Sequence, residues 1–289
     1  MESRDLEKSD IESLRERARF VRTETVRLVQ IAKSGHYSSV FSAAEILATL
    51  YYHTLRLSKD PKWQDRDRLI LSKGHVAVGV YPILADLGYF PKMWLESYAN
   101  LGSPLGDHPD MRKVPGIDFS SGSLGHGLSI GVGMALWLRA RNSPARVFVL
   151  LGDAELNEGQ IWEAAQSAAH FHIDNLIAIV DRNQMGLDGH TEEVMGVEPL
   201  PEKWRAFGWQ TYECDGHSVS DLVKTFDSIP KKSGYPQVVI AHTVKGRGVR
   251  YMEDSRLWLS PWFRCGSCEE GADGLWQLTS SCMRRNLGT

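Results

Sequence analysis

Residues 152–183 read GDAELNEGQIWEAAQSAAHFHIDNLIAIVDRN, and their pattern of apolar and polar residues indicates the fold class. A glycine and a carboxylate follow directly on the apolar run 147–151, and Asp-Arg-Asn follows a second apolar run, 176–180. Between the two runs, apolar residues recur at helical spacing over 158–171. Apolar strands joined by a helix are typical of a parallel sheet that is buried on both faces.

The rest of the chain alternates in the same way. Further helices are predicted at 9–35, 42–55, 126–141 and 219–229, and further strands at 67–75, 209–218 and 236–246. The fold class is therefore α/β, a doubly wound and mainly parallel sheet with helices on both faces. One domain is expected over residues 1–255, and 256–289, which lacks a clear period, is expected to be an irregular divergent tail.

Composition excludes several classes of partner. The 289 residues are 42% hydrophobic and 24% charged, with a formal charge of −3, so no basic footprint for nucleic acid is present. No apolar run approaches the roughly 18 residues of a membrane span. The charged start and the four cysteines favour neither a secretory signal nor a disulfide framework, so a cytoplasmic location is expected.

Polar residues follow the predicted strands, at the sheet edge where ligands of such folds bind. Asp153 offers a carboxylate, Asn183 an amide oxygen and Met185 a backbone carbonyl. Mg2+ takes hard oxygen ligands from one or two carboxylates and from phosphates. The nearby glycine and the start of helix 158–171 would suit a diphosphate. An ordinary turn and loop remain the alternative for each motif alone.

Several motifs in order carry a family resemblance. They are KSGHYSSVFSAAEILATLYY (33–52), DRLILSKGHVAVGVYPIL (67–84), GDHP (106–109), SSGSLGHGLSIGVGMAL (120–136) and HTVKGRG (242–248), together with 152–191. Over residues 10–253 the chain resembles the transketolase family, most closely the N-terminal, diphosphate-binding subunit of split transketolases. The resemblance implies thiamine diphosphate and Mg2+ as cofactors.

The resemblance also implies roles for individual residues. Asp153 and Asn183 would hold Mg2+ by their side chains, and Met185 by its carbonyl. His75 would contact the diphosphate and Lys245 would neutralise its charge. The residues implied to contact the cofactor are Ser39, His75, Gly122, Ser123, Leu124, Gly152, Asp153, Ala154, Asn183 and Lys245.

The implied reaction moves a two-carbon ketol unit from a ketose phosphate to an aldose phosphate. His36 and His108 would face the sugar and assist proton movement, and Glu158 would bridge to a catalytic glutamate of the partner. That partner would be a separate C-terminal subunit with the pyrimidine-binding domain, in an α2β2 assembly. Three alternatives stay open: an enzyme like 1-deoxyxylulose-5-phosphate synthase, a non-catalytic subunit that binds a partner, and a plain nucleotide-binding domain.

Two departures from the family pattern bear on activity. The third glycine of the usual Gly-Asp-Gly turn is Ala154, which would be strained at a positive φ and could crowd the diphosphate. No histidine follows His242, although the family has one in the stretch after the Lys-Gly motif. Cys265, Cys268 and Cys282 in the tail offer only three ligands of the four that a structural zinc site needs.

Overall fold

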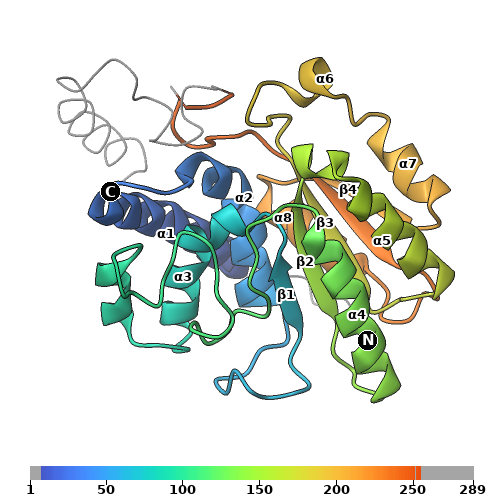
Figure 1. Cartoon of the computed structure of the whole chain (residues 1–289), viewed down its shortest axis with the longest axis horizontal. Helices are drawn as coiled ribbons and strands as arrows, with labels where there is room; N and C mark the ends of the chain where they lie inside the picture. The colour runs from blue at the N-terminus through green and yellow to red at the C-terminus, as the bar shows by residue number, and fades with distance from the viewer. Residues whose placement is uncertain (1–7, 251, 255–289) are drawn as a thin grey trace.

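A five-stranded parallel sheet forms the centre of the molecule (Figure 1). The computed structural model describes residues 8–250 and 252–254. The strand order is β1-β2-β3-β5-β4, and every pairing is parallel. The strands are β1 (Arg68–Leu71), β2 (Val147–Gly152), β3 (Leu176–Arg182), β4 (Gln210–Asp215) and β5 (Gln237–His242). The predicted fold class is confirmed, and the tail 256–289 lies outside the described residues.

One face of the sheet is covered by the helices of the N-terminal part and by α8. Figure 1 shows α1, α2 and α3 on the left. These helices are α1 (Lys8–Ala32), α2 (Tyr37–Thr49), α3 (Ala77–Asp86) and α8 (Val219–Ser228), with a π-helical turn at Leu50–Thr54. They pack on the alternate strand residues Leu71, Phe148, Leu150, Ile177 and Val239, all of which are buried. A strand turns successive side chains to opposite faces, so its other residues face the second layer.

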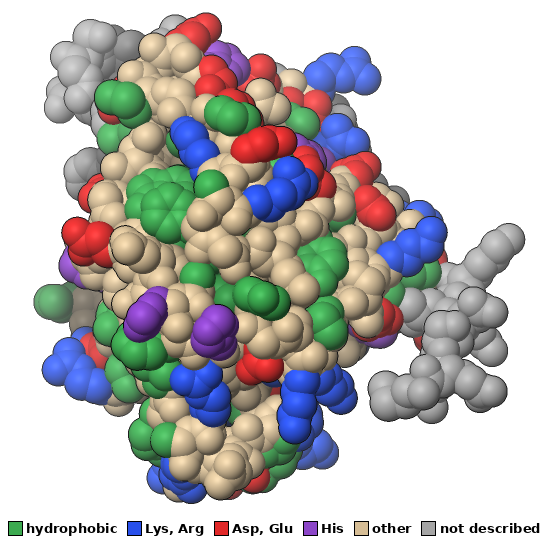
Figure 2. Space-filling view, turned by 90° about the vertical axis from the view of Figure 1, so that its right-hand side faces the viewer, with side chains coloured by type: hydrophobic (Ala, Val, Ile, Leu, Met, Phe, Trp, Pro, Cys, Tyr) green, Lys and Arg blue, Asp and Glu red, His purple; other side chains and the backbone are tan. Residues whose placement is uncertain are grey.

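The second layer consists of α4, α5 and α7, on the right in Figure 1. It packs on Val147, Val149, Ala178, Val180 and Ile240. The elements are α4 (His126–Ala140), α5 (Gly159–His170), α6 (Thr191–Val194) and α7 (Leu200–Ala206), with 3-10 turns at Gly74–Val76, Lys92–Ser97 and Ala154–Asn157. Figure 2 shows the outer surface on this side, where apolar side chains lie among charged ones. No described helix has the length and apolar character that a membrane crossing requires.

Glycines let α4 lie close to the sheet. A Cβ on Gly127 would lie 2.4 Å from Ser72 Oγ, and one on Gly131 would lie 2.7 Å from Val149 Cγ2. Real Cβ atoms do not approach so closely, so only glycine fits at these two positions. Close helix–sheet packing therefore explains part of the glycine-rich stretch 122–133.

The strand register determines which residues come together at the carboxyl ends of the strands. Gly152 pairs with Asp181, and Asp181 in turn pairs with Ala241 on β5. The residues that follow each strand therefore emerge level with one another. Asp153 and Asn183, far apart in the chain, are brought to one edge of the sheet by two neighbouring strands.

Candidate functional site

A cavity of about 220 Å3 opens at the carboxyl ends of the strands. Most of the expected site residues line it: His36, Ser39, His75, Leu124, Gly152, Asp153, Ala154, Asn183, Met185 and Lys245. Lys73, Glu155, Gly186 and Leu187 complete the lining. A larger cavity of about 530 Å3, lined by Arg139, Arg146 and Lys232 among others, lies at the opposite edge of the sheet and has none of these residues.

The expected metal ligands are three oxygen donors of different kinds. Asn183 is held by its amide nitrogen, which donates to Asp181 Oδ2 at 3.2 Å, and its Oδ1 accepts from the Met185 N–H at 3.1 Å. The Met185 carbonyl accepts from Lys245 Nζ at 3.4 Å. A carboxylate, an amide oxygen and a carbonyl form the hard donor set that Mg2+ prefers, so the residues fit this ion.

Asp153 is held by donors on both carboxylate oxygens. Oδ1 accepts from the Ala154 N–H at 2.8 Å, and Oδ2 accepts from the Gln184 N–H at 2.5 Å and from Arg182 Nη1 at 2.9 Å. Burial and the nearby Asp181 carboxylate raise the pKa of Asp153, against the opposing effect of Arg182. A bound cation would therefore favour the ionised carboxylate.

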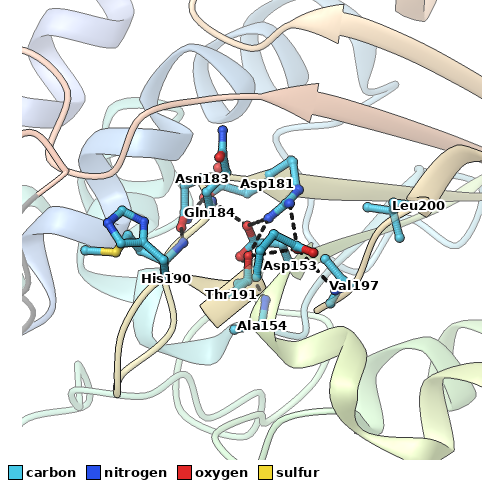
Figure 3. Close-up of polar contacts among 12 residues, drawn as sticks. Asp153, Ala154, Asp181, Asn183, Gln184, His190, Thr191, Val197 and Leu200 are labelled. Atoms are coloured by element: carbon cyan, nitrogen blue, oxygen red, sulfur yellow. Dashed lines mark hydrogen bonds and ion pairs between the residues drawn. The ribbon is translucent and has the colours of Figure 1, made fainter. Parts of the chain in front are cut away.

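Arg182 connects Asp153 to the segment that follows β3. Figure 3 shows Gln184 and Thr191 of this segment close to Asp153. Its guanidinium also donates to Thr191 Oγ1 at 2.8 Å, Glu192 Oε1 at 3.0 Å and Glu198 Oε1 at 3.0 Å. The side chain is only 4% exposed. Arg182 therefore fixes the segment 184–198, which contributes Met185 and Leu187 to the cavity.

Arg182→Lys is expected to destabilise the protein by about 1.5–3 kcal/mol. Lysine keeps the charge but lacks the planar fork of donors that satisfies four acceptors at once. Chemical denaturation measures the loss, and limited proteolysis should show earlier cleavage within 184–198. Arg205→Lys is the matched control because Arg205 is 52% exposed and its ion pair lies at the surface. Equal effects of the two substitutions would contradict the role given to Arg182.

A buried ion pair lies beneath the cavity. Lys73 Nζ is 2.5 Å from Asp181 Oδ2, and the two side chains are 2% and 0% exposed. Asp181 also accepts from Ser42 Oγ at 2.6 Å and from the Thr243 hydroxyl. Burial opposes the charge of Asp181, but Lys73 and these hydroxyls outweigh it and lower its pKa. The pair joins the ends of β1 and β3.

Glu155 holds the two glycine-containing loops together. Its carboxylate accepts from the N–H groups of Gly125 at 2.8 Å and Gly152 at 2.9 Å, and from Ser72 Oγ at 2.5 Å. Burial raises the pKa of Glu155, against these donors. The loop with Leu124 and the loop with Asp153 are thereby fixed relative to each other.

Ala154 has no positive φ, so alanine is not strained there. It starts the 3-10 turn Ala154–Asn157. The expected strain at a positive φ is therefore absent. A Cβ built on Gly186 would lie 3.4 Å from the Ala154 methyl group, which places this methyl against Gly186.

Lys245 is placed by a network of buried charges. Arg22 pairs with Glu45 at 2.6 Å, Glu45 with His217 Nδ1 at 3.1 Å, and His217 Nε2 accepts from the Val244 N–H at 2.8 Å. This network fixes the turn before Lys245. Burial and the charge of Lys73 lower the pKa of Lys245 to about 8.

Glu45 should make stability depend on acid pH. Burial opposes its ionisation, but His217 and Arg22 outweigh burial and lower its pKa from 4.5 to about 2. Because the pKa of Glu45 is lower in the folded protein than in the unfolded chain, its ionised carboxylate stabilises the fold at pH values above the unfolded pKa. This stabilisation is lost as the pH falls through the folded pKa. About 3 kcal/mol should disappear between these two pH values. Denaturation of wild type and Glu45→Gln across this pH range measures the contribution of Glu45 to stability. The difference in free energy of unfolding between the two should shrink toward pH 2, and a constant difference would contradict the role given to Glu45.

Three histidines lie together at the cavity. The ring centroids of His36 and His75 are 5.3 Å apart, and those of His36 and His108 are 6.0 Å apart. Burial lowers the pKa of His36 and, more strongly, that of His75. The structure thus gathers the histidines that the sequence motifs single out, although His108 does not line the cavity itself.

Three other expected residues lie beside the cavity without lining it. Gly122 lies next to His108, whose Cδ2 would be 3.4 Å from a Cβ at this glycine. Ser123 is the next residue in the same loop. Glu158 occupies the N-cap position of α5, with its Cβ against Gly125.

Comparison with known proteins identifies the family. Residues 14–256 match the sequence profile described as "Transketolase, thiamine diphosphate binding domain". The chain belongs to the transketolase family. Its thiamine diphosphate cofactor and the resemblance expected from the motifs are thereby confirmed. The 3-10 turns and strand ends described above are therefore those of a thiamine diphosphate-binding domain.

Among transketolase relatives, the chain is 41% identical over 251 residues to an apulose-4-phosphate transketolase subunit from Actinobacillus succinogenes, covering 86% of this chain and 90% of the relative. It is 40% identical over 241 residues to "6-deoxy-6-sulfo-D-fructose transketolase subunit SqwG" of a Clostridium species, covering 83% and 88%. The transketolase structure from Campylobacter jejuni superposes with a TM-score of 0.81 at 27% identity. It is matched over 96% of this chain but 48% of its own, so this chain spans about half its length.

Proposed function

We propose that the chain is the N-terminal subunit of a split transketolase, with its cofactor-binding domain over residues 1–255. It would move a two-carbon ketol unit from a ketose phosphate to an aldose phosphate. The observation that carries this proposal is the convergence of Asp153, Asn183, Met185, His75 and Lys245 around one cavity at the strand ends. They follow four strands, with His75 after β1, Asp153 after β2, Asn183 and Met185 after β3, and Lys245 after β5. The family binds thiamine diphosphate.

In the proposed site, Asp153 and Asn183 hold Mg2+ by their side chains and Met185 by its carbonyl. His75 and Lys245 face the diphosphate. Lys245, with its pKa lowered to about 8 by burial and Lys73, would regain its full charge beside an anion. When bound, thiamine diphosphate supplies the chemistry that breaks the carbon–carbon bond next to a ketose carbonyl.

The remaining cofactor contacts come from residues at the sides of the cavity. Leu124, in the loop fixed by Glu155, would support the aminopyrimidine together with its neighbours. The complete set proposed to contact the cofactor, besides the five residues above, is Ser39, Gly122, Ser123, Leu124, Gly152 and Ala154.

His36 and His108 are proposed to face the sugar. Burial lowers the pKa of His36, so its imidazole is neutral near pH 7 and can accept a proton from a hydroxyl group. His108 is 40% exposed and its ring lies 6.0 Å from that of His36, so a substrate from solvent would reach both imidazoles.

A separate C-terminal subunit is proposed to complete the site, in an α2β2 assembly. Both relatives named above are described as transketolase subunits, which supports a separate partner. The match covers 88% and 90% of their lengths, so they are about as long as this chain's matched part. Apolar side chains are exposed at the edge of the cavity, where Leu187 is 58% and Leu124 36% exposed. Such apolar surface favours association. Glu158, close to Leu124, would reach a glutamate of that partner.

The test is a transfer assay with purified chain, its separately encoded partner, thiamine diphosphate and Mg2+. A panel of ketose phosphates, and separately pyruvate, is tested as the donor with an aldose phosphate acceptor. Ketol transfer should appear only when both chains are present. Transfer by this chain alone, or release of carbon dioxide from pyruvate in place of ketol transfer, would overturn the proposal. Cofactor binding without ketol transfer from any donor would favour the alternative of a non-catalytic subunit that binds a partner.

A further inference from the structure

Three side chains at the cavity edge converge on one point. The carboxylate of Asp107 lies between His36 and His108, and one ligand atom from each of the three lies within 4.8 Å of the others. Asp107 Oδ2 is 3.6 Å from His36 Nε2 and 3.8 Å from His108 Nδ1. The three side chains are 32–40% exposed, so a small ion has access to them from solvent.

These separations do not suit hydrogen bonds. A hydrogen bond between nitrogen and oxygen spans about 2.7–3.2 Å, which is shorter than both distances. Around Zn2+, ligand atoms lie about 2.0–2.2 Å from the ion, so two ligands at a tetrahedral angle are about 3.4 Å apart. The two distances to Asp107 are close to this edge of a tetrahedron. The facing ligand atoms of His36 and His108 lie within 4.8 Å of each other, so a bound ion would draw the two imidazoles closer together.

The surroundings orient the ligands. The hydroxyl of Tyr98 donates to Asp107 Oδ1 at 2.9 Å, which leaves Oδ2 directed at the two imidazoles. Burial and the charge of Asp107 raise the pKa of Tyr98, so this hydroxyl stays protonated. Burial lowers the pKa of His36 and favours the neutral imidazole that binds metals. A second shell that fixes the ligands is typical of metal sites.

We propose that His36, Asp107 and His108 form a binding site for a zinc-type dication, distinct from the magnesium site at Asp153. Two imidazoles and one carboxylate favour Zn2+, Co2+ or Ni2+ over Mg2+. Three protein ligands leave the fourth position open to water or to a sugar hydroxyl. Because these histidines are proposed to face the sugar, the bound ion would compete with substrate; this consequence rests on the proposed function, whereas the site does not.

The test is titration of the full-length chain with Co2+, without thiamine diphosphate. Tetrahedral Co2+ absorbs strongly in the visible, and Zn2+ should displace it. We expect one equivalent to bind in wild type and in Asp153→Ala. Binding should be lost in His108→Ala and in Asp107→Asn, and weakened about 10-fold in Tyr98→Phe, which removes only the hydroxyl that orients Asp107.

The cysteines of residues 255–289 could also bind these ions, so a variant with Cys265, Cys268 and Cys282 replaced by serine is included. It should keep the wild-type spectrum. Loss of the spectrum in this variant, loss only in Asp153→Ala, or no saturable binding in wild type would each overturn the proposal. Circular dichroism confirms that the His108 and Asp107 variants remain folded.

Discussion

Asp181→Ala should lower the free energy of unfolding by about 3–5 kcal/mol, because it leaves Lys73 charged, buried and without its carboxylate. Lys73 is 2% exposed, so solvent cannot replace the lost partner. The same substitution removes the acceptor of Ser42 Oγ and of the Thr243 hydroxyl. Urea denaturation of wild type and variant at neutral pH measures the effect.

The double variant Lys73→Met with Asp181→Ala separates the cost of the unpaired buried charge from the cost of the lost hydrogen bonds. It removes the unpaired ammonium, so it should recover much of the stability that the single variant loses. The remaining loss would reflect the hydroxyls left without an acceptor. A single variant within about 1 kcal/mol of wild type would contradict the account of this pair as a fixed junction between β1 and β3.

Asp153→Ala should weaken Mg2+ binding in the presence of thiamine diphosphate by at least about 100-fold, beyond the range seen for residues that only support a ligand. Asp153 offers the carboxylate of the proposed donor set, and the oxygens of Asn183 and Met185 carry no formal charge. Replacing Mg2+ with Mn2+ allows free ion to be measured by electron paramagnetic resonance.

Asp174→Ala provides the matched control, because Asp174 lies beside the cavity at the opposite edge of the sheet. It removes one carboxylate without touching the strand ends and should leave Mn2+ binding unchanged. Equal affinity of the Asp153 variant and wild type would place the ion elsewhere.

The fold could be predicted because its signals are local and repeated. The runs 147–151 and 176–180 are long enough to be strands buried on both faces, and they appear as β2 and β3. Helix α3, Ala77–Asp86, was not predicted from the residues. Its valines, its internal proline and its uniformly apolar sequence show no helical period, because the helix is buried almost all round.

The expected ligands could be predicted from the sequence because they follow strand ends. The residues that hold these ligands in place could not be predicted. Arg182 and Asp107 stand in quoted motifs beside expected site residues, yet nothing in the sequence shows that they contact Asp153 and His36. Glu155 accepts from the N–H of Gly125, 30 residues earlier in the chain, a contact that only the packed structure brings about. A charge at or close to the end of a buried apolar run, as at Lys73 and Asp181, was the signal that could have found the ion pair.

Thiamine diphosphate should bind in this cavity only through a magnesium ion. The decisive measurement is calorimetric titration of thiamine diphosphate into the chain mixed with its C-terminal partner, once with Mg2+ and once with the metal chelated. We predict saturable binding with Mg2+, one cofactor for each copy of this chain, and none without the metal. Equal binding in the two titrations, or no binding in either, would contradict the account.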